Sequence, residues 1–188
     1  MNQLHPTHEE PLPRSHLPKG DEDVFISYTR NDMEIVKRIH DALQARNREA
    51  WIDWMGIGPA EEFLPAILEG IVNAQVFIFV ISPDSLKSHY CMAKELHCAV
   101  QSRKRIIPIQ IRPFTENDVT SEYRIFFEEL KKRNFISLRP EIDDFEDGIS
   151  RIIEALNIDV EHVRYHTEYL RLARVWRHLR KPRSRLLR

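Results

Sequence analysis

Cysteine, glycine and long apolar runs are scarce in this chain of 188 residues, which has two cysteines and five glycines. Cys91 and Cys98 are seven residues apart on one predicted helix, so their Cα atoms lie about 10 Å apart, too far for a disulfide. There is no apolar run of about 18 residues and no basic-then-apolar leader. We therefore expect a soluble cytoplasmic protein with free thiols and no contact with a membrane.

The standard nucleotide loops and metal clusters are also missing. The chain has no GxGxxG fingerprint and no Walker loop, so phosphate would not be held in either of these ways. His5, His8 and His16 could be taken for metal ligands, but they are scattered and no cysteine supports them. They fall within residues 1–20, where four prolines and the lack of apolar periodicity predict a disordered arm. No metal and no bound cofactor are expected.

The chain does contain short strand-like runs that alternate with helical periodicity. Apolar and β-branched runs predict strands at residues 23–29, 49–53, 76–81, 105–111 and 134–138. Helices are predicted after Asn31 as a side-chain cap, after the loop 54–62, after the turn 82–84, and over 141–156. Because parallel strands need crossover helices, we predict a flavodoxin-like, doubly wound α/β sandwich with five parallel strands and helices on both faces.

The stretch from Gln75 to Val100 organises the rest. Six consecutive apolar residues, 76–81, predict a strand buried on both faces, and a helix with an apolar stripe follows the Ser82-Pro83-Asp84 turn. Glu95 lies at the edge of that stripe. Ligands of open α/β sheets bind outside the carboxyl ends of the strands, so Glu95 is the first candidate for a functional residue.

The predicted domain occupies residues 21–156, and residues 157–188 form a helical, arginine-rich extension that we expect to lead into a missing region. Residues 171–188 contain eight basic side chains and no acidic one. Since the net charge is −1, the first 170 residues carry −9. The tail could attract nucleic acid, but no base-reading motif accompanies it, so we do not expect a nucleic-acid partner.

Four sequence boxes, in order, resemble Toll/interleukin-1 receptor (TIR) domains, especially those of bacteria. They are Asp23 to Tyr28 with an Asp shortly after, Ala50 to Asp53 leading into a Gly/Pro loop, Phe79 to Ser85, and Cys91 before Glu95-Leu96. The resemblance covers roughly residues 21–155. It implies one of two functions: an NAD glycohydrolase, which releases nicotinamide and linear or cyclic ADP-ribose in bacterial defence or signalling, or a catalytically silent assembly module.

The resemblance also implies roles for particular residues. Glu95 matches the catalytic glutamate of the enzymes, where a carboxylate stabilises the developing oxocarbenium charge. The alternative is an ordinary solvated carboxylate paired with Lys94, Lys87 or the basic residues at 103–105. The residues expected to bind substrate are Ser27, Tyr28, Thr29, Trp54, Tyr90 and Cys91. The loop expected to mediate self-association into dimers or filaments comprises Met55, Gly56, Ile57, Gly58 and Pro59; its alternative is a plain connection.

Two neighbours of Glu95 depart from the family pattern or leave a choice open. The enzymes often have an aromatic residue four positions before the glutamate, whereas Cys91 occupies that position here and the aromatic, Tyr90, comes five before. Either the loop shifts by one residue or the nicotinamide loses a stacking partner. Cys91 itself could act as a nucleophile, but no base partner is identifiable and a packing role is expected.

Overall fold

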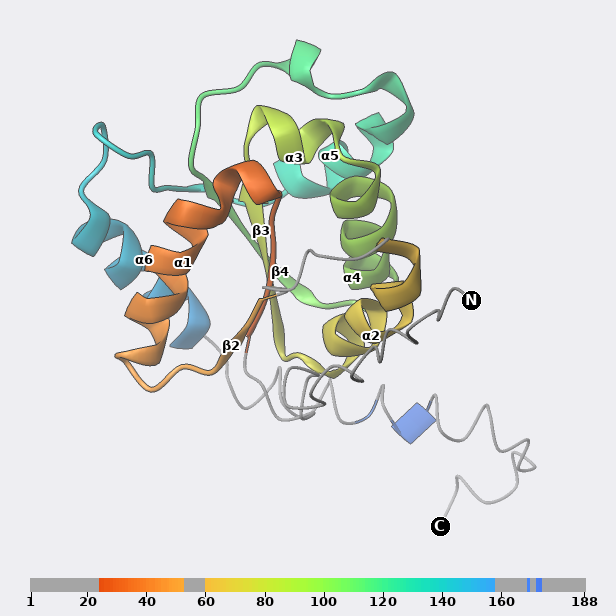
Figure 1. Cartoon of the computed structure of the whole chain (residues 1–188), viewed down its shortest axis with the longest axis horizontal. Helices are drawn as coiled ribbons and strands as arrows, with labels where there is room; N and C mark the ends of the chain where they lie inside the picture. The colour runs from red at the N-terminus through yellow and green to blue at the C-terminus, as the bar shows by residue number, and fades with distance from the viewer. Residues whose placement is uncertain (1–23, 53–59, 158–168, 170–171, 174–188) are drawn as a thin grey trace, which may run out of the picture.

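The computed structural model describes residues 24–52, 60–157, 169 and 172–173, and its centre is a five-stranded parallel sheet (Figure 1). The strand order is β2-β1-β3-β4-β5. The strands are β1 (Val24–Ser27), β2 (Ala50–Trp51), β3 (Val76–Ile81), β4 (Arg105–Gln110) and β5 (Ile136–Ser137). This is the flavodoxin-like order: β2 is added on one side of β1, and β3, β4 and β5 follow on the other side, so the strand order reverses between β1 and β3.

The central strands are buried because their residues are apolar on both faces. Every residue of β1 and β3 is buried, and the register pairs Val24 with Val76 and Ser27 with Phe79. The two edge strands are only two residues long; β2 pairs with β1 at Ala50 and Trp51, and β5 pairs with the end of β4. The carboxyl ends of β1, β3 and β4 therefore meet at one edge of the sheet.

Helices cover both faces, as predicted. The helical segments are α1 (Met33–Gln44), α2 (Ala60–Asn73), α3 (Pro83–Lys87), the π-helical segment η3 (Tyr90–Leu96), α4 (His97–Gln101), α5 (Arg124–Lys131) and α6 (Phe145–Asn157), with short 3-10 turns η2 (Arg30–Asp32), η4 (Glu116–Asp118) and η5 (Ser121–Tyr123). Helices α1 and α6 pack on one face, and α2, η3, α4 and α5 pack on the other (Figure 1).

Several predicted boundaries were wrong. Asn31 does not cap α1, since its side chain donates to Asp84 instead. The predicted turn at 82–84 begins a helix: Ser82 caps α3, with Ser85 completing the capping box and Pro83 in the first turn. The last helix starts at Phe145 rather than at residue 141, because Glu141 has a φ of 67°, which a right-handed helix does not allow.

The predicted arm at 1–20, the loop 53–59 and most of the extension at 157–188 lie outside the described residues. Of the extension, Tyr169 and Leu172 are described, and their side chains are exposed. Among the residues that the structure describes, no helix combines the length and the apolar character needed to cross a bilayer.

Candidate functional site

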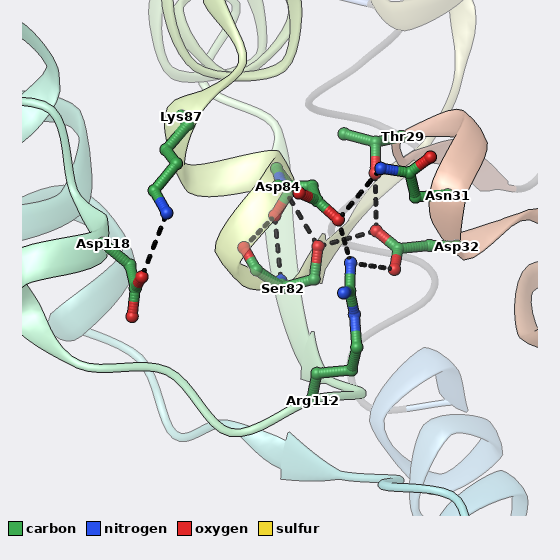
Figure 2. A network of polar contacts seen from close by, with 9 residues as sticks. Thr29, Asn31, Asp32, Ser82, Asp84, Lys87, Arg112 and Asp118 are labelled. Carbon is green, nitrogen blue, oxygen red and sulfur yellow. Dashed lines mark hydrogen bonds and ion pairs between the residues drawn. The ribbon is translucent and has the colours of Figure 1, made fainter.

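A network of polar side chains joins the carboxyl ends of β1, β3 and β4 (Figure 2). At its centre is the carboxylate of Asp32, a buried residue that follows β1. The hydroxyl groups of Thr29 and Ser82 both donate to Oδ2 of Asp32, each at 2.6 Å. A buried carboxylate is stable only when it is paired and hydrogen-bonded, so this network fixes the turn after β1 to the turn after β3.

Arg112 completes the network from the end of β4. Its guanidinium donates to Oδ1 of Asp32 at 2.7 Å and also pairs with Asp84 (Figure 2). The hydrogen bond from Arg112, followed by that from Asn31, lowers the pKa of Asp84. Burial alone would lower the pKa of Arg112, but its bonds to Asp84 and Asp32 raise it overall. Arg112 is therefore a permanent cation between two carboxylates.

Glu95 lies on η3, a segment with the wide turn of a π-helix. Such segments are rare and occur often at functional sites. Residues five apart in an α-helix are separated by about 140° around the axis, whereas i→i+5 hydrogen bonds bring them toward one face. The π-helical turn thus turns Tyr90 and Glu95, which are five residues apart, toward a shared side.

Cys91 connects Glu95 to the end of β1. Its thiol lies 3.4 Å from the carbonyl oxygen of Tyr28, to which it donates. Burial, and then the charge of Glu95, raise the pKa of the thiol far above its ordinary range. Cys91 is therefore protonated at neutral pH, which agrees with packing rather than with the nucleophilic alternative.

The hydroxyl of Ser27 faces the same side of the sheet as Glu95. Ser27 is 1% exposed, and its hydroxyl interacts with the Cys91 thiol and lowers the pKa of that thiol, although its Oγ makes no hydrogen bond of standard geometry in the described part of the chain. The only other buried side-chain atom of this kind among the described residues is Nε of Arg112. Both groups lie at the carboxyl ends of the strands, where ligands of this fold bind.

The structure brings some of the predicted substrate-binding residues together and separates others. Because side chains alternate along a strand, the ring of Tyr28 packs against the α1 and α6 side, opposite Ser27. Thr29 is engaged with Asp32, and Tyr90 is half-buried at the start of η3. Trp54 and all five residues of the predicted assembly loop lie outside the described residues. Lys87, one alternative partner for Glu95, pairs with Asp118 at 3.2 Å.

A pocket of about 260 Å³ opens on the other side of the polar network, and Glu95 does not line it. Its walls come from the start of α1 and the end of β4, and include Arg38, Ile111 and Arg112. Residues 53–59, which follow β2, are outside the described ranges. Within the described ranges, no three His, Cys, Asp or Glu side chains are grouped so as to hold a metal.

Arg112, His89 and Tyr123 were not predicted to lie near the candidate site. Arg112 had a usable signal, since it is a charged residue directly after the carboxyl end of a predicted strand. His89 and Tyr123 share a hydrogen bond across 34 residues of sequence. No pattern in the sequence indicates that these two side chains will be hydrogen-bond partners.

Three proteins illustrate what the chain is similar to. The NAD(+) hydrolase tir-1 of Caenorhabditis elegans is 37% identical over 95 residues, which cover 46% of this chain and 10% of that protein. The chain thus spans about a tenth of this relative's length. A metazoan TIR-STING receptor from C. gigas, solved with 2',3'-cGAMP, superimposes with a TM-score of 0.53 at 22% identity, covering 70% of this chain and 39% of that one.

The TIR domain heterodimer of RPS4 and RRS1 superimposes with a TM-score of 0.52 at 15% identity, covering 77% of this chain and 99% of that one. These two structural likenesses show a shared fold. The family model described as TIR domain matches residues 24–153, which include all five strands and the whole carboxyl edge. The chain therefore belongs to the TIR domain family.

Proposed function

We propose that this TIR domain cleaves the nicotinamide–ribose bond of NAD, with Glu95 as the catalytic residue. The observation that carries the proposal is the position of Glu95 on the π-helical segment η3, beside Cys91 and the end of β1. That position is at the reversal point between β1 and β3, where ligands of flavodoxin-like sheets bind. A relative named NAD(+) hydrolase, 37% identical over part of the chain, supports the same activity.

The chemistry requires a carboxylate near the ribose. As the bond between the ribose carbon and the nicotinamide nitrogen breaks, its electron pair leaves with nicotinamide and positive charge develops on the ribose. Water then adds to that carbon and loses a proton, which gives ADP-ribose; attack by an adenine nitrogen of the same molecule would give a cyclic form. A fixed carboxylate stabilises the charge in the transition state.

Glu95→Gln tests the assignment. Glu95 is half-buried and outside both apolar core clusters, so the variant should fold with an unchanged melting temperature. Loss of the negative charge should lower the rate of nicotinamide release about 100-fold or more. The matched control is Glu69→Gln, an exposed glutamate of α2, which should keep the wild-type rate. Turnover that survives in a folded Glu95→Gln protein would remove this residue from the reaction.

We also propose that the domain acts by self-association. The heterodimer of RPS4 and RRS1 TIR domains is a precedent for contact between such domains. If two copies associate through the loop 55–59, we expect the second copy to exclude water from the candidate site at Glu95. The alternative of a silent assembly module shares this contact, and the Glu95→Gln comparison separates the two. A role in bacterial defence or signalling would be the biological setting of the activity.

A further inference from the structure

We propose that His89 and Tyr123 are positioning residues for the Glu95 site, and that they act by fixing the ring of Tyr90. The inference rests on the proposed function, because it gives Tyr90 a substrate to contact. It starts from three aromatic rings that meet where α3 ends and η3 begins, here called the His89 cluster: His89, Tyr90 and Tyr123.

In the His89 cluster, the imidazole of His89 lies between the rings of the two tyrosines. Nδ1 of His89 and the hydroxyl of Tyr123 lie 3.0 Å apart in a hydrogen bond. The imidazole also meets the ring of Tyr90 edge to face, with centroids 6.1 Å apart and an interplanar angle of 80°. The same imidazole lies 6.0 Å from the ring of Tyr123. His89 therefore touches both tyrosines, and Tyr90 is held from one side.

Tyr123 is the buried member of the His89 cluster. It is 6% exposed and belongs to the core on the α5 side of the sheet. It ends η5 and leads directly into α5, whose Phe127 and Leu130 are buried in the same core. His89, in contrast, is exposed, so its position depends on its bond to Tyr123. Because buried Tyr123 holds exposed His89, and His89 contacts Tyr90, Tyr123 can order the ring of Tyr90 without contacting a ligand itself.

The direction of the chain places Tyr90 at the candidate site. His89 faces Tyr123, and two residues later Cys91 faces the carbonyl of Tyr28 at the end of β1. Tyr90 comes between these two directions, and the π-helical turn brings it toward the side of Glu95. Its half-buried ring is the nearest described aromatic before Glu95 along the chain, and a flat, charged nicotinamide ring stacks well on such a surface.

A second contact ties the same two segments together. Nζ of Lys87, at the end of α3, lies 3.2 Å from Oδ1 of Asp118 in η4 (Figure 2). Lys87 is more than half exposed, so this pair contributes little to stability. The long connection between β4 and α5 thus meets the segment from the end of α3 to the start of η3 at two points, and the contact made by the His89 cluster is the one that includes Tyr90.

The kinetic test uses Tyr123→Phe, which removes one hydroxyl and keeps the buried ring. Without the bond to Tyr123, His89 and Tyr90 must be ordered by the substrate, so the KM for NAD should rise about 3- to 10-fold with little change in kcat. His89→Ala should have the same effect. The double variant Tyr90→Ala/Tyr123→Phe should match Tyr90→Ala alone, since Tyr123 acts only through Tyr90.

The matched control is His97→Ala, since His97 is another exposed histidine in ring contact with an aromatic residue, Phe126, two turns further along. Its KM should equal that of the wild type. Effects of Tyr123→Phe and Tyr90→Ala that simply add in the double variant would show a general structural role and overturn the inference. An unchanged KM in Tyr123→Phe would overturn it as well.

A readout without substrate separates this inference from the proposed function. In NMR spectra of the free protein, the ring signals of Tyr90, assigned with Tyr90→Phe, should shift in Tyr123→Phe and not in His97→Ala. A wild-type protein that releases no nicotinamide from NAD would refute the proposed function and the role in catalysis together. If the wild-type protein cleaves NAD but the Tyr90 signals do not shift in Tyr123→Phe, the inference is overturned and the proposed function stands.

Discussion

The buried negative charge of Asp32 is compensated by the guanidinium of Arg112. The Asp32 side chain is 1% exposed, and Arg112 is the only positively charged partner that the described contacts give it. We expect Arg112→Met to lower the free energy of unfolding by about 2 to 4 kcal/mol, because it leaves a buried charge uncompensated while the Thr29 and Ser82 hydroxyls still donate. The change is measured as a shift of the urea midpoint at constant m-value.

Two further variants control this result. Arg46→Met breaks a comparable pair with Glu146, but both of those side chains are substantially exposed, so the cost should stay below about 1 kcal/mol. In the double variant Asp32→Asn/Arg112→Met the buried charge is gone, and part of the lost stability should return. Equal losses for Arg112→Met and Arg46→Met would contradict the idea that burial of Asp32 sets the cost.

At the scale of residues, the sequence identified candidates but not their partners. The strand-end rule led to Glu95 and to Ser27, and the structure places both at the carboxyl edge. It could not lead to the bond between Arg112 and Asp32, which are 80 residues apart, because a charged side chain has no sequence signal for its partner. The roles of Glu95 and of the other predicted substrate-binding residues stay predictions until variants are measured.

Among the elements, the connection between β5 and α6 should make stability sensitive to acid. Arg139 donates to both carboxylate oxygens of Asp143 through its guanidinium, and its backbone N–H also donates to Oδ2. The guanidinium bonds, followed by the backbone bond, lower the pKa of Asp143 from 3.8 to about 2. A lowered pKa in the folded state stabilises the protein above the ordinary pKa, and this contribution disappears as the pH falls through the folded value.

We therefore expect the stability difference between the wild type and Asp143→Asn to be constant above about pH 5 and to vanish between about pH 4 and pH 2. The measurement is the urea midpoint of both proteins across that range. Arg139→Met should reproduce the behaviour of Asp143→Asn, because it removes the other half of the pair. A difference that persists unchanged at pH 2 would count against the Arg139 pair as its source.

The elements themselves were predicted to different degrees. The strand 76–81 was predicted with its observed bounds, because six apolar residues between polar turns fit nothing shorter or longer. Helix α5 was missed, although Tyr123, Phe127 and Leu130 recur at helical spacing and are buried. The division of one predicted helix into α3, η3 and α4 has no periodic signal, since a widened turn is imposed by packing and not by the preference of single residues.

For the whole molecule, the arginine-rich tail is expected to be peripheral. The sheet and its covering helices are complete at α6, which ends at Asn157, and the described Tyr169 and Leu172 are 71% and 47% exposed. Deletion of residues 171–188 should leave the melting temperature within a few degrees, as surface changes usually cost under about 0.5 kcal/mol. Truncation after residue 144, which removes the buried face of α6, is the contrasting variant and should unfold the domain. A deletion of 171–188 that unfolds the protein would place Trp176 in the core.

The second expectation at this scale concerns assembly. If a neighbouring copy completes the Glu95 edge through the loop 55–59, nicotinamide release per molecule should rise with protein concentration. Ile57→Asp places a charge in that loop and should keep the activity at the low-concentration level. A specific activity that is flat from nanomolar to high micromolar protein, and equal in Ile57→Asp, would mean that each monomer carries a finished site.

The two-residue edge strands decide how such copies can meet. In the described part of the chain, the edge strands Ala50–Trp51 and Ile136–Ser137 are each two residues long, so we expect them to be poor templates for the addition of another strand. If copies of the domain associate, we expect their contacts to be made by side chains of helices and loops. Contacts of that kind separate without breaking a ladder of main-chain bonds, so we expect such an assembly to dissociate on dilution and not to grow toward amyloid through its sheet.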